Sequence, residues 1–355
     1  LSAEELDTLM AKYPDLEVTY TLGLAGKEYS ADTTSVDLSA LSPTEILAAA
    51  ETLGRMPELA NVELMTAAGT SSLSLSDVQT LVDAAPQASF HYTFTLFDKT
   101  ISTNDTQVEF KNLSLTEADI PALRSALGVM TDCTAFILDN CGLSSEQMAQ
   151  IRADYPRTEL VWRIKFGKYS AMTNAETIRA VYNVFDDTSS ELQYCWRVKY
   201  MDIGHNETLT DLSFVGSMPE LEILIASGCA VKELTGFENC KKLEFLELAY
   251  CYKLENIDAL AGCENLKNLN ICYSKVSSLK ALDGLPLEQF MCKQTRVPAA
   301  EQKVFNEIHP KCVTNFYGKE PYAGAGWRYV DNGKTFTEIY KKVREVFGYD
   351  DMPQS

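Results

Sequence analysis

The chain has 355 residues, of which 46% are hydrophobic and 10% aromatic, so it contains enough apolar material to bury a large core or a long stacked one. Its 31 lysines and arginines against 50 aspartates and glutamates give a net charge of −19, which repels phosphate backbones and anionic lipid surfaces. We therefore expect neither nucleic acid nor a bare membrane surface as a partner.

No window of about 18 or more residues is predominantly apolar, so we expect no membrane insertion within this chain. No charged segment followed by an apolar one, the pattern of an export signal, opens the chain. The sequence begins at Leu1 rather than Met. We expect that something N-terminal to it has been removed, either an export segment or another part of the natural protein.

A unit of about 70 residues recurs in the N-terminal half of the chain. Each copy has a serine followed three residues later by Glu, Asp or Gln, which resembles a capping box at a helix start, and then a proline that stops the helix. The three sets are Ser2, Glu5 and Pro14, then Ser74, Asp77 and Pro86, then Ser144, Gln147 and Pro156. Stripes at helical spacing predict one buried face, formed by Leu6, Leu9 and Met10 and again by Val78, Leu81 and Val82.

Strands are expected after each helix, because apolar residues alternate with polar ones there. The alternating sets are Val18, Tyr20, Leu22 and Leu24, then Phe90, Tyr92, Phe94 and Leu96, then Leu160, Trp162, Ile164 and Phe166. Short strands fill the rest of each unit, at Val36 and Leu38, Val62 and Leu64, Val108 and Phe110, and Phe136 and Leu138. The pattern is least regular from Tyr169 to Tyr194, where we expect a bulging helix near Ala175 to Phe185.

A compact repeat follows, in which Leu221, Leu243, Leu266 and Leu287 each open the tolerant pattern Leu-x-x-Leu-x-Leu-x-x-Asn/Cys at spacings of 22, 23 and 21 residues. Val198, Met201 and Ile203 supply an earlier copy. The last position turns inward, where a small side chain must satisfy backbone groups exposed by the bend. It is occupied by Asn206, Cys229, Cys251, Ser274 and Thr295.

Three more apolar columns align in the segments between these strands. They are Leu212, Leu234, Ile257 and Leu279, then Val215, Phe237, Leu260 and Leu282, then Met218, Cys240, Cys263 and Leu285. No single repeat could bury its columns alone, so the repeats must share one core. The prediction is an α/β leucine-rich-repeat solenoid, a curved parallel sheet with helices and loops on its outer side.

We predict irregular long repeats over 1–197, compact repeats over 198–296, and a C-terminal repeat with a capping helix over 297–355, in one continuous solenoid. The C-terminal repeat runs through Val297, Glu301, Phe305, Pro310 and Phe316. Helical spacing of apolar residues predicts the last helix, which should cover the open C-terminal end of the stack. Those residues are Phe336, Ile339, Tyr340, Val343 and Phe347.

The compact repeats, the units ending in Trp162 to Lys168, and Gly326-Trp327-Arg328 before an aromatic helix resemble a known group of proteins. It is a family of uncharacterised leucine-rich-repeat proteins of gut clostridia and related Gram-positive bacteria, and the resemblance covers most of the chain. It implies a secreted, extracellular or cell-surface location. It supplies no catalytic residue and no established activity.

Patterns typical of enzymes are absent from the sequence. The histidines His91, His205 and His309 lack a partner at common metal-site spacing, so we expect no metal and no cofactor. No glycine-rich phosphate loop, nucleophile elbow or Cys and His pairing is present. We predict a protein that is not an enzyme, because an active site would need a deep pocket with convergent titratable groups.

The ten cysteines mostly occupy repeat positions, so we expect free buried thiols. Cys229 and Cys251 fill the bend, Cys240 and Cys263 an inward column, and Cys292 an inward strand position. Equivalent residues on neighbouring strands lie about 5 Å apart, so a bridge between stacked cysteines stays open.

Residues between the inward leucines form rows on the concave face, and an exposed apolar and aromatic patch there predicts a binding surface. The candidate ligand-binding residues are Tyr200, Asp202, His205, Ile223, Ile225, Phe245, Glu247, Tyr250, Asn268, Asn270, Tyr273, Gln289 and Met291. The alternative is that the irregular third unit or the C-terminal segment folds over this face and buries it.

The leading functional hypothesis is a non-enzymatic module that binds a protein or peptide through the concave strand face. The alternative is a carbohydrate-binding adhesin of the cell surface, because Tyr250 and Tyr273 could stack on sugar rings. A glycan array would separate the two. A purely structural spacer in the cell envelope is a further possibility.

Overall fold

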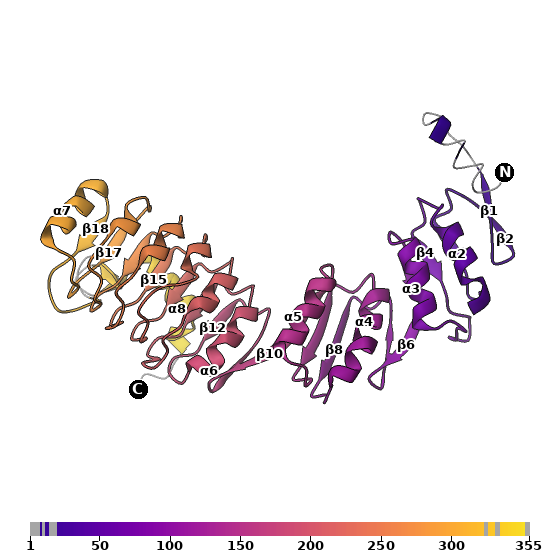
Figure 1. Cartoon of the computed structure of the whole chain (residues 1–355), viewed down its shortest axis with the longest axis horizontal. Helices are drawn as coiled ribbons and strands as arrows, with labels where there is room; N and C mark the ends of the chain where they lie inside the picture. Colours follow the sequence, from indigo (N-terminus) through magenta and orange to yellow (C-terminus); the bar gives the residue numbers. More distant parts are fainter. Residues whose placement is uncertain (1–7, 9–10, 14–19, 323–325, 331–333, 352–355) are drawn as a thin grey trace. The chain divides into compact units, whose positions relative to one another are not determined.

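The computed structural model describes residues 8, 11–13, 20–322, 326–330 and 334–351. The chain divides into two compact units, Leu1–Leu160 and Val161–Ser355 (Figure 1). The residues on which the first predicted helix rests and the strand position Val18 lie outside the described residues; the former are Ser2, Glu5, Leu6, Leu9, Met10 and Pro14. That the whole chain forms one continuous solenoid stays a prediction.

The first unit begins with an antiparallel hairpin of β1 (Thr21–Leu24) and β2 (Lys27–Ser30). A parallel sheet follows, made of β3 (Ser35–Asp37), β4 (Asn61–Glu63) and β5 (Ser89–His91). The helices α2 (Ile46–Leu53) and α3 (Leu75–Ala84) connect these strands. Val36, Val62 and Phe90 lie in register and are buried, as predicted.

The same plan recurs further along the first unit. A hairpin of β6 (Thr93–Leu96) and β7 (Lys99–Ser102) precedes β8 (Gln107–Lys111), α4 (Ile120–Val129), β9 (Ala135–Asp139) and α5 (Ser145–Asp154). β8 pairs with β9 in parallel, with Val108 opposite Phe136 and Phe110 opposite Leu138. The short strands predicted from the sequence are therefore confirmed.

Capping boxes fix the starts of α3 and α5, as the sequence predicts. The Ser74 hydroxyl accepts a hydrogen bond from the Asp77 backbone N–H, and the Asp77 carboxylate accepts one from the Ser74 N–H at 2.8 Å. Ser144 and Gln147 form the same reciprocal pair. Each box satisfies backbone donors that the first helical turn leaves without partners.

The second unit contains most of β10 (Glu159–Phe166), which forms an antiparallel hairpin with β11 (Tyr169–Met172). A seven-stranded parallel sheet in chain order follows. Its strands are β12 (Thr177–Arg179), β13 (Tyr200–Asp202), β14 (Ile223–Ile225), β15 (Phe245–Glu247), β16 (Asn268–Asn270), β17 (Gln289–Met291) and β18 (Val313–Asn315). The helix expected near Ala175 to Phe185 is wrong, because Ile178 pairs in register with Met201 and is buried as one more repeat strand.

Short helical segments return the chain from each strand to the next. They are α6 (Asp186–Ser189), η3 (Ser190–Tyr194), η4 (Ser213–Ser217), η5 (Phe237–Asn239), η6 (Asp258–Gly262), η7 (Lys280–Leu282) and α7 (Ala299–Ile308). Leu224, Leu246 and Leu269 are opposite one another on adjacent strands and fully buried, so they share one core. This is the leucine-rich-repeat solenoid predicted from the sequence.

The bend position behaves as the sequence predicts. The Asn206 side chain donates to the carbonyl oxygens of Ile203 at 2.7 Å and Ala180 at 3.0 Å, and accepts from the Val184 N–H at 2.8 Å. In later repeats the Cys251 thiol donates to the Ala226 carbonyl at 3.3 Å. All ten cysteines are free thiols, and all except Cys312 are buried. No helix among the described residues is long and apolar enough to span a membrane.

The last elements among the described residues are the strand pair β19 (Tyr329–Val330) and β20 (Thr335–Phe336), then α8 (Glu338–Val346) and η8 (Tyr349–Asp351). The predicted amphipathic helix is present, but its expected position at the open C-terminal end of the stack is wrong. Its residues pack against Tyr200, Ile223 and Ile225, which belong to β13 and β14. The helix therefore lies along the strands of the sheet instead of behind the last one.

Candidate functional site

Strands β13 to β17 place two rows of side chains on the concave face. Parallel pairing aligns them in the predicted register, as Tyr200, Ile223, Phe245, Asn268 and Gln289, and as Asp202, Ile225, Glu247, Asn270 and Met291. The expectation that the apolar members of these rows are exposed is wrong. Ile223 and Phe245 are fully buried, Ile225 is 6% exposed, and of both rows Tyr200 alone is half-buried.

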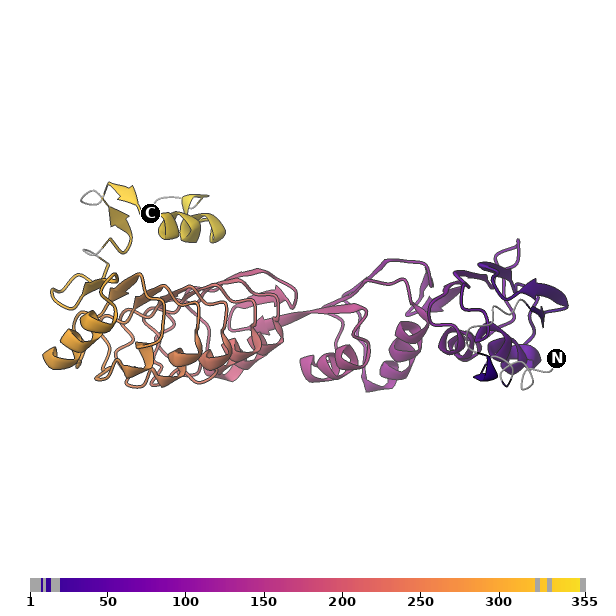
Figure 2. The ribbon, with the colours of Figure 1, turned by 90° about the horizontal axis from the view of Figure 1, so that it is seen from above.

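The C-terminal strap, defined as residues 326–330 and 334–351, covers this face. Figure 2 shows the strap lying along the sheet, on the side away from the return segments. Trp327, Tyr340, Val343 and Phe347 are buried in one cluster with residues of the two rows. The Trp327 ring stacks on Phe245, with centroids 4.9 Å apart. The alternative in which the C-terminal segment covers the concave face is therefore correct.

Glu247 lies at the centre of this interface and is 1% exposed. Its carboxylate accepts hydrogen bonds from the Trp327 indole N–H at 2.6 Å and from the Ser227 hydroxyl at 3.2 Å, and pairs with Arg328 at 3.3 Å. The Arg328 guanidinium in turn lies 3.6 Å from the centre of the Tyr322 ring. A buried charge needs such partners, because its desolvation is otherwise very costly.

A second carboxylate, that of Asp202, meets the end of the strap. Its Oδ2 accepts a hydrogen bond from the Tyr349 hydroxyl, and its Oδ1 accepts one from the Gly204 N–H at 3.0 Å. Burial raises the pKa of Asp202 above its ordinary value, although these two hydrogen bonds oppose the shift. Burial and the neighbouring Asp202 charge also raise the pKa of Tyr349, so the proton stays on the phenol.

The connection between β18 and the strap is also tied to the sheet. Side chains of the sheet donate hydrogen bonds to successive backbone carbonyl oxygens there. Tyr273 donates to Lys319 at 2.7 Å, Lys293 to Glu320 at 2.7 Å, Gln294 to Gly318 at 2.9 Å and Asn270 to Pro321 at 3.1 Å. Residues 318–321 are therefore held against the sheet.

A cavity of about 240 Å³ remains beneath the strap, lined by Arg179, Asp202, Glu247 and Arg328 among others. The two carboxylates already accept hydrogen bonds from donors within the chain. Their arrangement fastens the strap to the sheet.

A column of residues at the edge of the sheet stays accessible. Each column residue stands five positions after the first residue of its strand and has a left-handed backbone, with φ between 57° and 79°. In chain order they are Tyr182, His205, Gly228, Tyr250, Tyr273 and Gln294. Backbone hydrogen bonds to the next repeat hold the strained conformation, from the N–H of His205 to Ser227 O at 2.7 Å and from that of Tyr250 to Cys272 O at 2.9 Å.

The rings of Tyr182, His205, Tyr250 and Tyr273, which we name the aromatic column, form two stacked pairs. Tyr182 and His205 have centroids 5.2 Å apart, and Tyr250 and Tyr273 have centroids 5.0 Å apart. Tyr182 is 55% exposed, His205 is exposed, and Tyr250 and Tyr273 are half-buried. Tyr252, 61% exposed, packs beside Tyr250 with centroids 6.0 Å apart.

The predicted site residues thus fall into two groups. His205, Tyr250 and Tyr273 belong to the accessible column, whereas the others lie on the face that the strap covers. Tyr182 is not among the predicted site residues because a helix was expected there, although Tyr182 has the same place in its repeat as His205. The contacts of Trp327 with the sheet were not predicted either, since nothing in the repeat period signals them.

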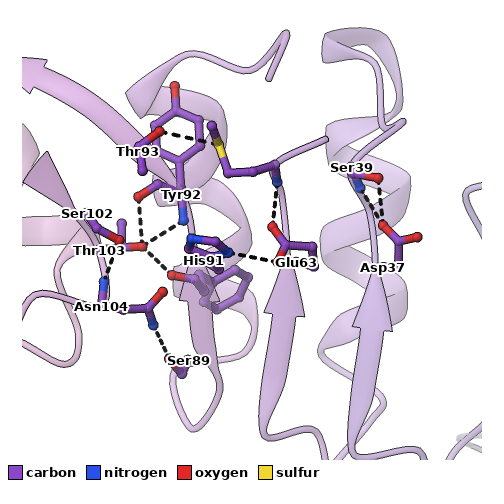
Figure 3. A network of polar contacts seen from close by, with 12 residues as sticks. Asp37, Ser39, Glu63, Ser89, His91, Tyr92, Thr93, Ser102, Thr103 and Asn104 are labelled. Atoms are coloured by element: carbon purple, nitrogen blue, oxygen red, sulfur yellow. Dashed lines mark hydrogen bonds and ion pairs between the residues drawn. The ribbon is translucent and has the colours of Figure 1, made fainter. Parts of the chain in front are cut away.

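The first unit presents a polar network on its small parallel sheet (Figure 3). Asp37, Glu63 and His91 lie opposite one another on β3, β4 and β5. The His91 imidazole Nδ1 lies 2.7 Å from a Glu63 oxygen, and both side chains are more than 40% exposed. Solvent weakens such a pair, so it contributes little to the stability of the sheet.

No protein-family model matches the sequence, and no curated protein matches it. Among solved structures, the chain is similar to the internalin InlF of Listeria monocytogenes, with 14% identity, 92% of this chain and 93% of that chain covered, and a TM-score of 0.37. A leucine-rich-repeat protein of Leptospira interrogans shows 13% identity, with 75% of this chain and 74% of that chain covered and a TM-score of 0.37. The functional domain of InlJ from Listeria monocytogenes shows 13% identity, with 82% of this chain and 70% of that chain covered and a TM-score of 0.35. The repeat geometry described above, and not these likenesses, establishes the fold.

Proposed function

We propose that this chain is a non-enzymatic module that binds a protein partner through the aromatic column. The observation that supports this most directly is a set of stacked, accessible rings beside a concave face that the chain's own strap fills. Tyrosine supplies a large contact area and a hydroxyl at its tip, which is why it is enriched where proteins bind one another.

The concave face itself is a poor docking surface in this protein. Uncovering it would expose Trp327, Tyr340, Val343 and Phe347, at about 1.5–3 kcal/mol each or roughly 6–12 kcal/mol together. A partner with micromolar to nanomolar affinity has only about 8–12 kcal/mol of binding free energy in total. Displacing the strap would use most of it, so the partner should bind where no displacement is needed.

The column is also ordered before any partner arrives. Stacking fixes the rings of Tyr250 and Tyr273, and the Tyr273 hydroxyl is held by the Lys319 carbonyl. Ordering a flexible side chain on binding costs about 0.5–1.5 kcal/mol, and most of that cost is avoided for rings that are already fixed. A rigid aromatic surface of this kind favours protein recognition.

Site-specific photo-crosslinking tests the proposal. The photoreactive residue p-benzoylphenylalanine replaces Tyr252, which lies beside the column, or Val304 on α7, which is 50% exposed and remote from it. We expect adducts with one partner protein, identified by mass spectrometry, from position 252 and not from position 304. Equal adducts from both positions, or none from 252, would contradict the proposal.

Binding of the identified partner to column variants then measures the role of the rings. His205→Ala and Tyr273→Ala should each weaken the affinity about tenfold, the effect expected for a residue in the centre of an interface. Unchanged affinity in both folded variants would exclude the column. A glycan array with the unmodified protein examines the alternative function, a carbohydrate-binding adhesin.

The location of the protein is part of the same proposal. We propose that it is secreted or displayed at the cell surface, as the family resemblance of the sequence implies. Lys303 has an 80% exposed side chain and is one suitable target for a membrane-impermeant amine reagent. Labelling of the protein on intact cells or in the medium supports this location, whereas labelling only after lysis contradicts it.

A further inference from the structure

The aromatic column has a gap at Gly228. This glycine stands between His205 and Tyr250, at the position where the neighbouring repeats carry a ring. A cavity of about 360 Å³ opens there, lined by His205, Glu207, Gly228, Cys229, Ala230, Tyr250, Tyr252 and Lys253. A cavity of this size lies in the range of about 300–1,000 Å³ that is typical of ligand pockets.

The gap has the width of one ring. Neighbouring strands are about 4.8 Å apart, so His205 and Tyr250, two strands apart, are separated by roughly twice that distance. A ring placed midway would lie about 5 Å from each neighbour, within the usual range for aromatic pairs. The stacked pairs on either side have the same separations, 5.2 Å and 5.0 Å.

The backbone does not require a glycine at this position. A Cβ atom added to Gly228 would come no closer than 3.6 Å to any other atom, its nearest neighbour being the Cα of His205. Its φ of 79° lies in the left-handed region that His205 and Tyr250 adopt at 59° and 63°. The missing side chain therefore leaves usable space between two ring faces, and neither a clash nor a unique turn accounts for it.

The charges around the gap favour a neutral occupant. Glu207 and Lys253 line the cavity with opposite charges, and among the described residues neither side chain has an ion-pair or hydrogen-bond partner. The lining has no excess of either charge to attract a phosphate or a metal ion. The net charge of −19 also disfavours an anionic ligand.

We propose that this gap receives one aromatic side chain, Phe, Tyr or Trp, from the partner protein. The inserted ring stacks between His205 and Tyr250 and completes the column, while the polar groups of Glu207 and Lys253 contact the residues that flank it. This inference rests on the proposed function and adds the chemistry of the partner's contact.

Saturation-transfer NMR of the full chain with 4-methylphenol and indole as probes tests the gap directly. Gly228→Tyr fills the gap, and we expect it to weaken binding of both probes about tenfold or more. Gly284→Tyr adds the same side chain at a glycine in open space outside the column and serves as the matched control. Methyl β-D-glucoside is included as a sugar probe and should give no saturation transfer.

Folding is checked separately. Gly228→Ala introduces the same left-handed Cβ without filling the gap, so its melting temperature measures the backbone strain alone. If Gly228→Tyr does not fold, His205→Ala, which removes one wall of the gap, replaces it and should weaken probe binding. Retained probe binding in a folded Gly228→Tyr variant, or in His205→Ala where Gly228→Tyr does not fold, would overturn the inference. Binding of the glucoside as strong as that of the aromatic probes would also overturn it.

The partner found by crosslinking separates the two proposals. Loss of affinity in both Tyr273→Ala and Gly228→Tyr supports both of them. Loss in Tyr273→Ala alone leaves the proposed function standing and overturns the insertion of a partner ring. Unchanged affinity in both variants overturns both.

Discussion

Trp327→Ala should detach the C-terminal strap from the sheet. The indole is fully buried, stacks on Phe245 at a centroid distance of 4.9 Å, and donates a hydrogen bond to Glu247 at 2.6 Å. Truncation removes the packing and the hydrogen bond together. It also leaves a carboxylate that is 1% exposed with one donor fewer.

The expected loss is large compared with the stability of a domain. Replacing a buried Trp by Ala costs about 3–5 kcal/mol, and an unsatisfied buried acceptor adds about 1–3 kcal/mol. The free energy of unfolding of a domain is about 5–15 kcal/mol. Trp327→Phe isolates the second effect, because phenylalanine keeps a ring against Phe245 and lacks the N–H, so it should cost about 1–3 kcal/mol.

Hydrogen exchange and urea unfolding measure these effects. In Trp327→Ala we expect the amides of α8 to lose their protection while those of β15 keep theirs, since the leucine core behind the sheet is untouched. A drop of less than about 1 kcal/mol in the free energy of unfolding, with α8 still protected, would refute the argument that this indole anchors the strap.

Three further predictions concern the second unit. Burial raises the pKa of Asp202 above 3.8, so the folded state holds this proton more tightly than the unfolded chain, and the free energy of unfolding falls as pH rises above 3.8. Asp202→Asn should therefore raise the melting temperature more at pH 7 than at pH 4. An equal rise at both pH values would contradict this. Asn206→Ala should lower the free energy of unfolding in urea by about 2–4 kcal/mol, because three buried backbone groups lose their hydrogen-bond partner. Asn265→Ala removes one exposed hydrogen bond and should lower it by less than about 1 kcal/mol. Burial raises the pKa of the Cys251 thiol to about 12, so iodoacetamide at pH 8 should leave it unmodified in the folded protein and alkylate it in urea. Rapid labelling of Cys251 in the native state would contradict this and show that the repeat core is open.

The repeat core was predictable because its signals are local and periodic. Leu224, Leu246 and Leu269 recur at fixed spacing, and the bend residue Asn206 has a side chain that suits its three backbone partners. The capping box at Ser74 is likewise a signal that spans four residues. Such features depend on neighbours along the chain or on the next repeat, so a period in the sequence is enough to reveal them.

The strap could not be placed by the same means. The hydrogen bond between Trp327 and Glu247 joins residues 80 positions apart, and that between Tyr349 and Asp202 joins residues 147 positions apart. Ile223 and Phe245, at outward positions of their strands, do indicate that something covers them. Outward apolar residues, however, indicate only that a cover exists, and they are the same whether the cover is another molecule or a later part of the chain.

A physical argument separates these two kinds of cover once the geometry is known. A segment tethered to the sheet by a short flexible link competes with a free partner for the concave face at an effective concentration in the millimolar range. In this chain the link is shortened further, because residues 318–321 are hydrogen-bonded to Tyr273, Lys293, Gln294 and Asn270. A free partner at micromolar concentration would therefore need at least about a thousandfold higher intrinsic affinity for the same face. The aromatic column stays partly exposed while the strap is in place, so a partner that binds there has no such competitor, which is why recognition through the column is the stronger hypothesis.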